Sequence, residues 1–373
     1  MKITEIITEA ASARIAHAED LVFFEGSKGA IRALDALAST ATPDKSISIK
    51  FDGSPALYFG RLPDGQFVLT DKSGFTAKGY NGLPTTAEDL KNMFLQRGKE
   101  VNDARVQFAS QMASLWNRFE KTVPKDFRGF VKGDLLYRTQ PQVDKNGDYT
   151  FTPNVVTYHI KAESDLGKRI AMSTAAIAVH NKTAGPNAPD EHIDLNELNQ
   201  DTEVMIVGPS YVEHAPRVDT KQVVASKKIV LKYAHDIDSF LDINALSALK
   251  LSDLADILYT FVNAMVKSGT LTGLANSFMT WLPNSKISAV KQERIVQYIK
   301  ENNKGFAAIF SIVELVMRIK DDIIQQLDAA DAPIRASINN NPGGEGYVKS
   351  HEQGPVKLVN RSGFSAANFA KER

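Results

Sequence analysis

The segment Ser48-Ile49-Lys50-Phe51-Asp52-Gly53-Ser54 is the most informative part of this 373-residue sequence. Apolar and polar residues alternate from Ile47 to Asp52, which is typical of a β-strand with one apolar and one polar face. The alternation places Ser48, Lys50 and Asp52 on the polar face, and Gly53 ends the strand. A lysine beside a carboxylate at this position could act as an amine nucleophile on a phosphate. A solvated lysine followed by an Asp-Gly turn gives the same pattern, so the segment alone leaves both interpretations open.

The surrounding sequence predicts an α+β protein built on antiparallel sheets. A hairpin signal, Pro63-Asp64-Gly65, lies between two strand patterns, and strand patterns return later in the chain. Helices are predicted in 1–40 (two helices, with an apolar run of undecided type at 21–24), 85–121 and 237–330. The predicted strands are 47–51, 56–61, 66–71, 130–137, 154–161, 204–207, 228–233, 345–350 and 355–359.

Residues 237–330 differ in kind from the rest of the chain. Turn signals are sparse there, and helical periodicity is clearest from Phe306 to Leu327, which predicts about four helices. We therefore predict an N-terminal helical segment (1–45), a sheet-containing domain (46–236 and 336–373) and an all-α insertion (237–335).

Composition excludes several classes of protein. The 44 basic and 44 acidic residues balance, so a nucleic-acid contact would have to be a local patch. The absence of cysteine excludes disulfides, thiolate zinc sites and a cysteine nucleophile. No apolar run approaches about 18 residues and no signal peptide is recognisable, so we expect a cytoplasmic protein with no membrane partner.

Four further motifs follow the Lys50 segment in order. They are Gly133-Asp134 at the end of an apolar strand, Tyr158 within a strand, Glu345-Gly346-Tyr347-Val348, and Lys357 in the last strand. Together with Lys50-Phe51-Asp52-Gly53, they resemble the motifs of the covalent nucleotidyltransferase superfamily, which contains ATP-dependent RNA and DNA ligases and mRNA capping enzymes. Ser54 makes the first motif most similar to that of tailed-phage RNA ligases.

The resemblance implies a ligase-type nucleotidyltransferase core and a site for ATP with Mg²⁺ or Mn²⁺. Lys50 would attack the α-phosphate of ATP, with Asp52 and Lys357 as further catalytic residues, and Asp134 and Glu345 would bind the ribose or the metal ion. Lys357 would neutralise the α-phosphate, Tyr158 would stack on the adenine, and Ser48 would contact the base. Gly53 and Lys349 complete the predicted nucleotide-binding residues.

Two departures from the family pattern affect these expectations. The last motif has one lysine where the family has two, and Lys349 or Arg361 could replace the second. Too few residues follow Val359 for the C-terminal OB domain of DNA ligases and capping enzymes, so the helical insertion could replace it.

The predicted function is ATP-dependent joining of RNA or DNA ends or nicks through a lysyl-AMP intermediate, in the cytoplasm of an infected cell if the protein comes from a phage. One alternative is nucleotidyl transfer to a cap or a protein. Another is a catalytically inactive relative that binds nucleic acid. The choice of RNA or DNA and the oligomeric state stay open.

Overall fold

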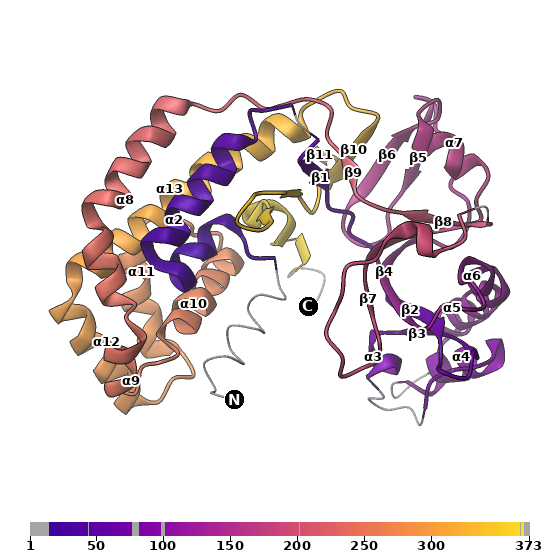
Figure 1. Cartoon of the computed structure of the whole chain (residues 1–373), viewed down its shortest axis with the longest axis horizontal. Coiled ribbons are helices and arrows are strands. Elements are labelled where there is room, and N and C mark those ends of the chain that lie inside the picture. Colours follow the sequence, from indigo (N-terminus) through magenta and orange to yellow (C-terminus); the bar gives the residue numbers. More distant parts are fainter. Residues whose placement is uncertain are drawn as a thin grey trace. The chain divides into compact units, whose positions relative to one another are not determined.

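A computed structural model describes residues 15–43, 45–76, 82–97, 101–200, 202–365 and 367–368 (Figure 1). The chain divides into two compact units. The first, here called the sheet unit, contains the described parts of 51–210 and 331–344. The second, the helical unit, contains the described parts of 14–50, 211–330 and 345–373.

The sheet unit contains two sheets. The larger has the strand order β3-β2-β4-β7-β8, antiparallel except for the parallel pair β7 and β8, and the smaller has the order β11-β10-β6-β5. The strands of the larger sheet are β2 (Ala56–Arg61), β3 (Phe67–Asp71), β4 (Gly129–Tyr137), β7 (Ala175–Thr183) and β8 (Val204–Val207). Those of the smaller are β5 (Asp148–Phe151), β6 (Thr157–Lys161), β10 (Ile334–Ile338) and β11 (Asn341–Pro342).

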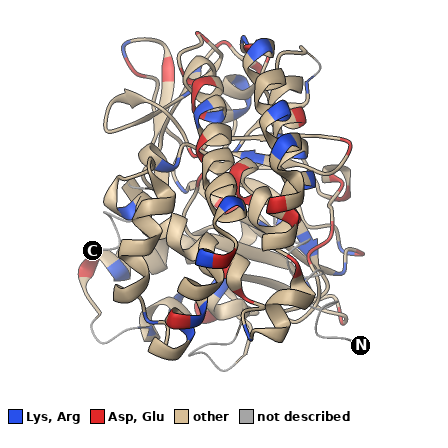
Figure 2. Ribbon diagram, turned by 90° about the vertical axis from the view of Figure 1, so that its left-hand side faces the viewer, with Lys and Arg blue, Asp and Glu red and all other residues tan. Residues whose placement is uncertain are grey.

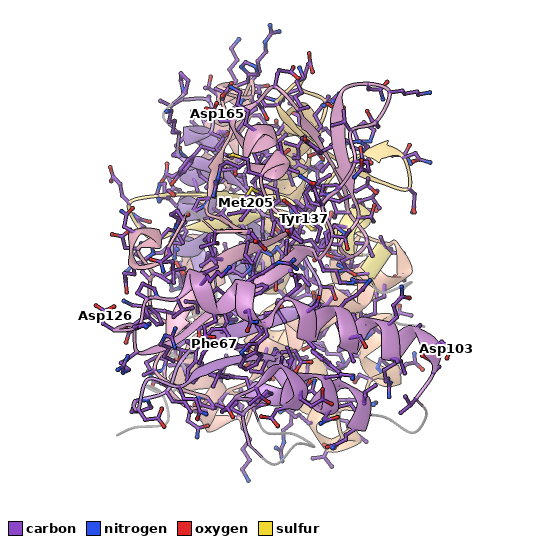
Figure 3. All side chains as sticks on the ribbon, turned by 90° about the vertical axis from the view of Figure 1, so that its right-hand side faces the viewer. Phe67, Asp103, Asp126, Tyr137, Asp165 and Met205 are labelled. Atoms are coloured by element: carbon purple, nitrogen blue, oxygen red, sulfur yellow. The ribbon has the colours of Figure 1, made fainter. Side chains whose placement is uncertain are left out.

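Helices cover one face of the larger sheet. Alternate residues of β2 and β4, including Phe59 and Val131, are buried with apolar residues of α4 to α6. Phe67, labelled in Figure 3, packs edge-on against Trp116 with 5.1 Å between ring centroids, whereas Asp103 and Asp126 lie on opposite rims of that view. The helices of this unit are α3 (Lys72–Phe75), α4 (Ala87–Gln96), α5 (Asp103–Ser114), α6 (Trp116–Thr122), α7 (Asp165–Ala171) and the 3₁₀ turn η2 (Leu195–Glu197).

The helical unit is built around three mutually packed helices, α2, α8 and α13. Figure 2 shows basic and acidic residues interspersed along the helices. A small antiparallel sheet of order β13-β12-β1-β9 lies at one side of their core. Its strands are β1 (Ile47–Ile49), β9 (Ser210–Tyr211), β12 (Tyr347–Lys349) and β13 (Val356–Leu358). The helical elements are η1 (Ala18–Asp20), α2 (Leu21–Ser39), α8 (Thr220–Phe240), α9 (Ile243–Ala248), α10 (Leu254–Ser268), α11 (Leu274–Trp281), η3 (Leu282–Asn284), α12 (Ala289–Glu301), α13 (Asn303–Asp328) and the π-helical turn η4 (Arg361–Ser365).

The predicted α+β class with antiparallel sheets is confirmed, and the apolar run at 21–24 is the start of α2. The strand predicted at 228–233 is wrong, because these residues lie inside α8. Ile229 and Leu231 are exposed, and the buried residues of α8 instead repeat at helical spacing, as in Val223, Ser226 and Val230. The first predicted helix, in 1–14, lies outside the described residues. Within the described ranges, no helix combines the length and the apolar character that a membrane span requires.

The two units divide the chain differently from the predicted domains. Strands β12 and β13 belong to the helical unit, because β12 pairs with β1 and their apolar residues, such as Tyr347 and Leu358, are part of the helical core. Strand β10, which follows α13, belongs to the sheet unit because it pairs with β6. The N-terminal helix α2 packs within the helical unit.

Candidate nucleotide site

Strand register brings three predicted site residues to one face of the small sheet in the helical unit. Ser48 is opposite Val348, and Val348 is opposite Lys357, so these residues share a face. The backbone N–H of Lys50 donates a hydrogen bond to the carbonyl of Gly346 at 2.9 Å, which continues the pairing two residues beyond Ser48. Lys50 therefore lies on the face of Ser48 and Lys357, opposite the face that packs on the helical core.

Lys50 and Glu345 form an ion pair on this face although they are 295 residues apart in the chain. Their side chains are 23% and 14% exposed, so the pair is partly shielded from water. Gly346 makes this geometry possible, because its φ of +130° favours glycine and a Cβ there would meet the carbonyl oxygen of Leu358 at 2.2 Å. The Glu-Gly pair of the sequence motif thus has a physical reason in this structure.

Lys349 is placed elsewhere, contrary to the expectation that it contacts the nucleotide beside Lys50. It is opposite Ile47 on the core-facing side of β12, where its side chain is almost completely buried and its ammonium donates a hydrogen bond to the hydroxyl of Ser46. Arg361, the other candidate for the missing lysine, is also buried and forms ion pairs with Glu19 and Asp20. Lys357 is half-buried and is the lysine of this motif on the Lys50 face.

A buried carboxyl group supports the strand that follows Glu345. The hydroxyl of Tyr347 in β12 donates a hydrogen bond of 2.8 Å to Asp328 at the end of α13. Burial raises the pKa of Asp328 to about 6, although the bond from Tyr347 acts in the opposite direction. The folded protein therefore holds a proton on Asp328 at a pH where the unfolded chain, with an aspartate pKa of about 3.9, has released it.

We expect this group to make the free energy of unfolding depend on pH. A raised carboxyl pKa contributes stability that is complete below about pH 4 and is lost as pH rises through about 6. Asp328→Asn keeps an acceptor for Tyr347 but removes the titration, so urea unfolding at pH 4 to 8 is expected to show a flatter profile and higher relative stability at pH 8. Asp322→Asn, an exposed position on the same helix, is the matched control. If Asp328→Asn had the same dependence of unfolding free energy on pH as the wild type, Asp328 would not be the group responsible.

The other four predicted residues, Asp52, Gly53, Asp134 and Tyr158, lie in the sheet unit, where Gly53 approaches β4 closely. A Cβ on Gly53 would meet the carbonyl oxygen of Leu135 at 2.7 Å and the Cβ of Asp134 at 2.9 Å. The N–H of Ser54 donates to the Leu135 carbonyl at 3.0 Å, which fixes the loop to the strand. Asp52 precedes this contact and is 9% exposed. The contact brings together Gly53 and Asp134, two residues that the sequence predicts to bind the nucleotide.

Asp134 has a partner that the sequence did not reveal. Its carboxylate is 3.0 Å from Nε2 of His180, a residue of β7. Two positions earlier in β4, Lys132 forms a second ion pair with Asp190 at 2.9 Å on the same side of the sheet. Burial acts to lower the pKa of Lys132, but its interactions with Asp190 and Tyr58 together outweigh burial and raise that pKa. Predicting this contact would require predicting strand β7, which carries His180. Ala175, Ala176 and Ala178 hide the alternation of apolar and polar residues in that strand.

Tyr158 does not present a ring face for adenine in this structure. It is completely buried, with its ring centroid 5.1 Å from that of Phe51 and 5.6 Å from that of Phe151. Its hydroxyl accepts a hydrogen bond from the backbone N–H of Asp52. The residue thus positions the Lys-Phe-Asp-Gly segment, and the expected stacking on the base is not supported by this burial.

Among the described residues, one group of three possible metal ligands lies close together: Asp144, Asp148 and His159, with ligand atoms within 4.8 Å of one another. Asp148 is already paired with Arg335, and the carboxylate of Asp144 accepts backbone N–H bonds from Asn146 and Asp148. These backbone bonds lower the pKa of Asp144. The group therefore belongs to the tight turn at Asn146-Gly147, and it does not include the predicted metal ligands Asp134 and Glu345.

The chain was compared with protein families, curated proteins and solved structures. Residues 13–373 match a protein family described as "Family of unknown function (DUF6267)". No curated protein and no solved structure matches the chain significantly.

Proposed function

The chain belongs to the DUF6267 family, and we propose that it is an ATP-dependent nucleotidyltransferase that carries AMP on Lys50 and passes it to the end of an RNA or DNA strand. One observation carries the proposal: Lys50 is paired with Glu345 on the sheet face that also presents Ser48 and Lys357. A surface lysine followed by an Asp-Gly turn does not by itself explain why residues this far apart in sequence gather around the amine.

The proposed first step forms a phosphoramidate. The neutral Nζ of Lys50 attacks the α-phosphorus of ATP, a P–N bond forms, and the P–O bond to the β-phosphate breaks. Pyrophosphate leaves with the electron pair, and the amine releases its proton to solvent. Because the attacking amine must be neutral, the ion pair with Glu345 has to open when the nucleotide binds.

The donor set on the Lys50 face suits ATP with a divalent cation. Lys357 supplies a positive charge for the α-phosphate, Ser48 supplies a hydroxyl for the base, and Glu345 supplies a carboxylate oxygen of the kind that Mg²⁺ and Mn²⁺ prefer. A bound cation would reduce the negative charge of the phosphates during the transfer. In the sheet unit, Asp134 is the proposed ribose or metal ligand, and Asp52 is the second carboxylate of the motif.

Covalent labelling tests the proposal. Purified protein incubated with Mg²⁺ and ATP labelled at the α-phosphate is expected to acquire one acid-labile, base-stable AMP per chain. Strand-joining assays on nicked and free-ended RNA and DNA then identify the acceptor. An adduct without strand joining would favour a cap or protein acceptor, and the absence of any adduct would favour a binding protein without catalysis.

Glu345→Ala and Asp134→Ala are each expected to slow formation of the adduct by at least about a hundredfold, equivalent to about 3 kcal/mol of transition-state stabilisation. Each carboxylate is proposed to hold the metal ion or the ribose against the reacting phosphate. Asp134→Glu restores the residue usual in the resembling superfamily and is expected to be tolerated. Single-turnover labelling measures all three, with Asp322→Asn as a control on the exposed side of α13. Wild-type rates in both alanine variants would show that the motif assignments are coincidental.

A further inference from the structure

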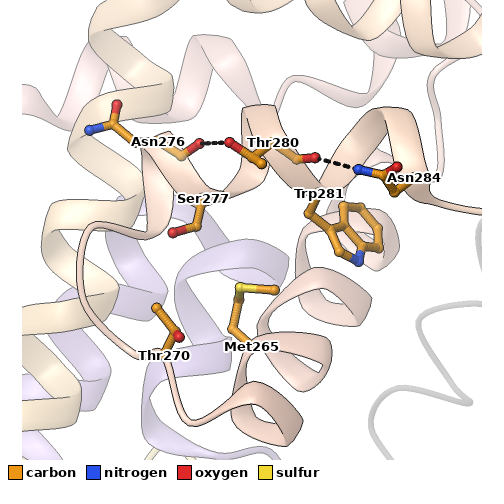
Figure 4. Close-up of a pocket in the computed structure, with 7 residues that line it drawn as sticks. All are labelled: Met265, Thr270, Asn276, Ser277, Thr280, Trp281 and Asn284. Atoms are coloured by element: carbon orange, nitrogen blue, oxygen red, sulfur yellow. Dashed lines mark hydrogen bonds between the residues drawn. The ribbon is translucent and has the colours of Figure 1, made fainter.

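A pocket of about 500 Å³ lies between the end of α10, the loop that follows it, and α11 of the helical unit (Figure 4). It falls within the range of roughly 300–1,000 Å³ that is usual for small-ligand sites. None of the 7 residues that line it is charged, and none belongs to the site around Lys50. A pocket without charge is a poor site for a metal ion, a free phosphate or an ammonium group, and it suits a neutral ligand.

The wall of the pocket contains a supported aromatic ring. Trp281 is half-buried, and its ring centroid is 5.4 Å from that of Phe261 and 5.8 Å from that of Phe278. Figure 4 shows the indole and the thioether of Met265 reaching into the same space. Two polarisable surfaces, one of them flat and held in place by packing, favour a planar ring as the ligand.

Polar groups around these surfaces can donate hydrogen bonds to such a ring and accept them from it, so they do not restrict the ligand to one ring structure. The hydroxyl of Ser277 donates to the carbonyl of Gly273 at 3.1 Å and so keeps its lone pairs available as acceptors. The indole N–H of Trp281 makes no hydrogen bond with the described residues and is a donor. Thr270 adds an exposed hydroxyl at the edge.

We infer that this pocket binds a nucleobase of single-stranded nucleic acid. The inference rests on the proposed function, because the ligand is the strand that would receive AMP. Stacking on an aromatic side chain accepts every base, which suits an enzyme that acts on strand ends of any sequence. Exposed Lys286 follows the pocket residue Asn284 by two positions, and its charge favours the backbone of such a strand.

The experiment measures binding of a fluorescein-labelled single-stranded oligonucleotide of mixed sequence to the full chain, by anisotropy and by tryptophan fluorescence. Trp281→Ala is expected to weaken binding by about fivefold to a hundredfold, as loss of one stacked base does elsewhere, and Trp281→Phe by less. We expect the oligonucleotide to quench the tryptophan fluorescence of the wild type but not that of Trp281→Phe. The reason is that the other tryptophan, Trp116, is buried in the sheet unit. The duplex of the same sequence is expected to bind more weakly.

Two further variants separate binding from folding. Ser277→Asp places a negative charge in the neutral pocket without removing the packing of Trp281, and it is expected to weaken binding at least fivefold. Met279→Ala, an exposed residue of the same helix outside the pocket, is the matched control and is expected to bind as the wild type does.

Any one of three results would overturn the inference. They are wild-type affinity in both Trp281→Phe and Ser277→Asp, quenching that persists in Trp281→Phe, and equal affinity for the duplex. AMP labelling of Lys50 is measured in parallel without oligonucleotide and is expected to be unchanged in these variants. If the protein acquires no AMP on Lys50 but still binds single strands through Trp281, the proposed function alone is refuted. If the protein acquires AMP on Lys50 but the pocket variants do not change its affinity for single strands, this inference alone is refuted.

Discussion

Lys50→Ala is expected to abolish formation of the AMP adduct, to less than about a thousandth of the wild-type rate, because it removes the amine proposed to attack the α-phosphorus. Lys50 has a side chain only 23% exposed, but it lies on the polar face of β1 and contributes little to the apolar core. The variant is therefore expected to remain folded, with an unfolding midpoint close to that of the wild type. Labelling with α-labelled ATP, followed by peptide mapping, measures the result.

Lys50→Arg separates the nucleophile from the charge. A guanidinium group can keep the ion pair with Glu345, but it stays protonated at any accessible pH and cannot form the phosphoramidate. Loss of the adduct in both Lys50→Ala and Lys50→Arg, with normal labelling in a variant of an exposed lysine such as Lys221→Ala, would assign the chemistry to the amine. An adduct that persists in Lys50→Ala would remove Lys50 from the mechanism.

Several elements around the site could be predicted from sequence because their residues alternate clearly. The strand at 56–61 coincides with β2, and 204–207 coincides with β8. Each short strand has Gly, Pro, Asp or Ser close to at least one end, which marks where the pairing ends. The long helix from Phe306 to Leu327 could be predicted because its apolar residues recur at helical spacing. The structure buries these residues in α13, as in Ile309 and Val313.

The faces of β12 could not be predicted from alternation alone. Strand period places Glu345 with Tyr347 and Lys349, on the face that the structure buries. The left-handed φ of Gly346 interrupts this period, so Glu345 pairs with Lys50 whereas Lys349 faces the core. The error in the expectation for Lys349 therefore comes from one backbone angle that the sequence suggests only through the glycine.

The burial of Tyr158 and of Arg361 could not be predicted from the sequence for a different reason. Both are residue types that bind nucleotides well, but burial depends on packing between segments far apart in sequence. Tyr158 is enclosed by Phe51 and Phe151, and Arg361 is enclosed with Glu19 and Asp20 from the other end of the chain. No local pattern predicts such contacts.

Arg361 is part of a buried ionic network that no sequence pattern predicts. The ammonium of Lys320 in α13 is 2.7 Å from Glu19, and Nε of Arg361 is 2.9 Å from the same carboxylate. Arg361 also pairs with Asp20, and all four side chains are at most 3% exposed. Burial acts to raise the pKa of Glu19, but the charges of Lys320 and Arg361 outweigh it and hold that pKa at about 2. Burial raises the pKa of Asp20 to about 7, so above that pH two positive and two negative charges balance one another within the core.

Lys320→Met is therefore expected to lower the free energy of unfolding by about 3–5 kcal/mol, because it leaves one negative charge buried without compensation. Lys320→Met combined with Glu19→Gln restores the balance, since Arg361 and Asp20 still form a pair. The double variant is expected to be more stable than Lys320→Met alone, although two substitutions usually cost more than one. Urea unfolding of the wild type, both single variants and the double variant measures the coupling at pH 8.5, where Asp20 is ionised.

An exposed ion pair of the same unit shows what the network adds. Lys291 and Asp253 are 2.6 Å apart, but their side chains are 26% and 49% exposed. Lys291→Met is expected to cost less than about 1 kcal/mol, because water screens the charge that remains. Since the network ties η1 and α13 to the turn that follows β13, the rescued double variant is also expected to recover the AMP-labelling rate. Equal losses from Lys320→Met and Lys291→Met, or simple additivity in the double variant, would show that the buried charges are not coupled.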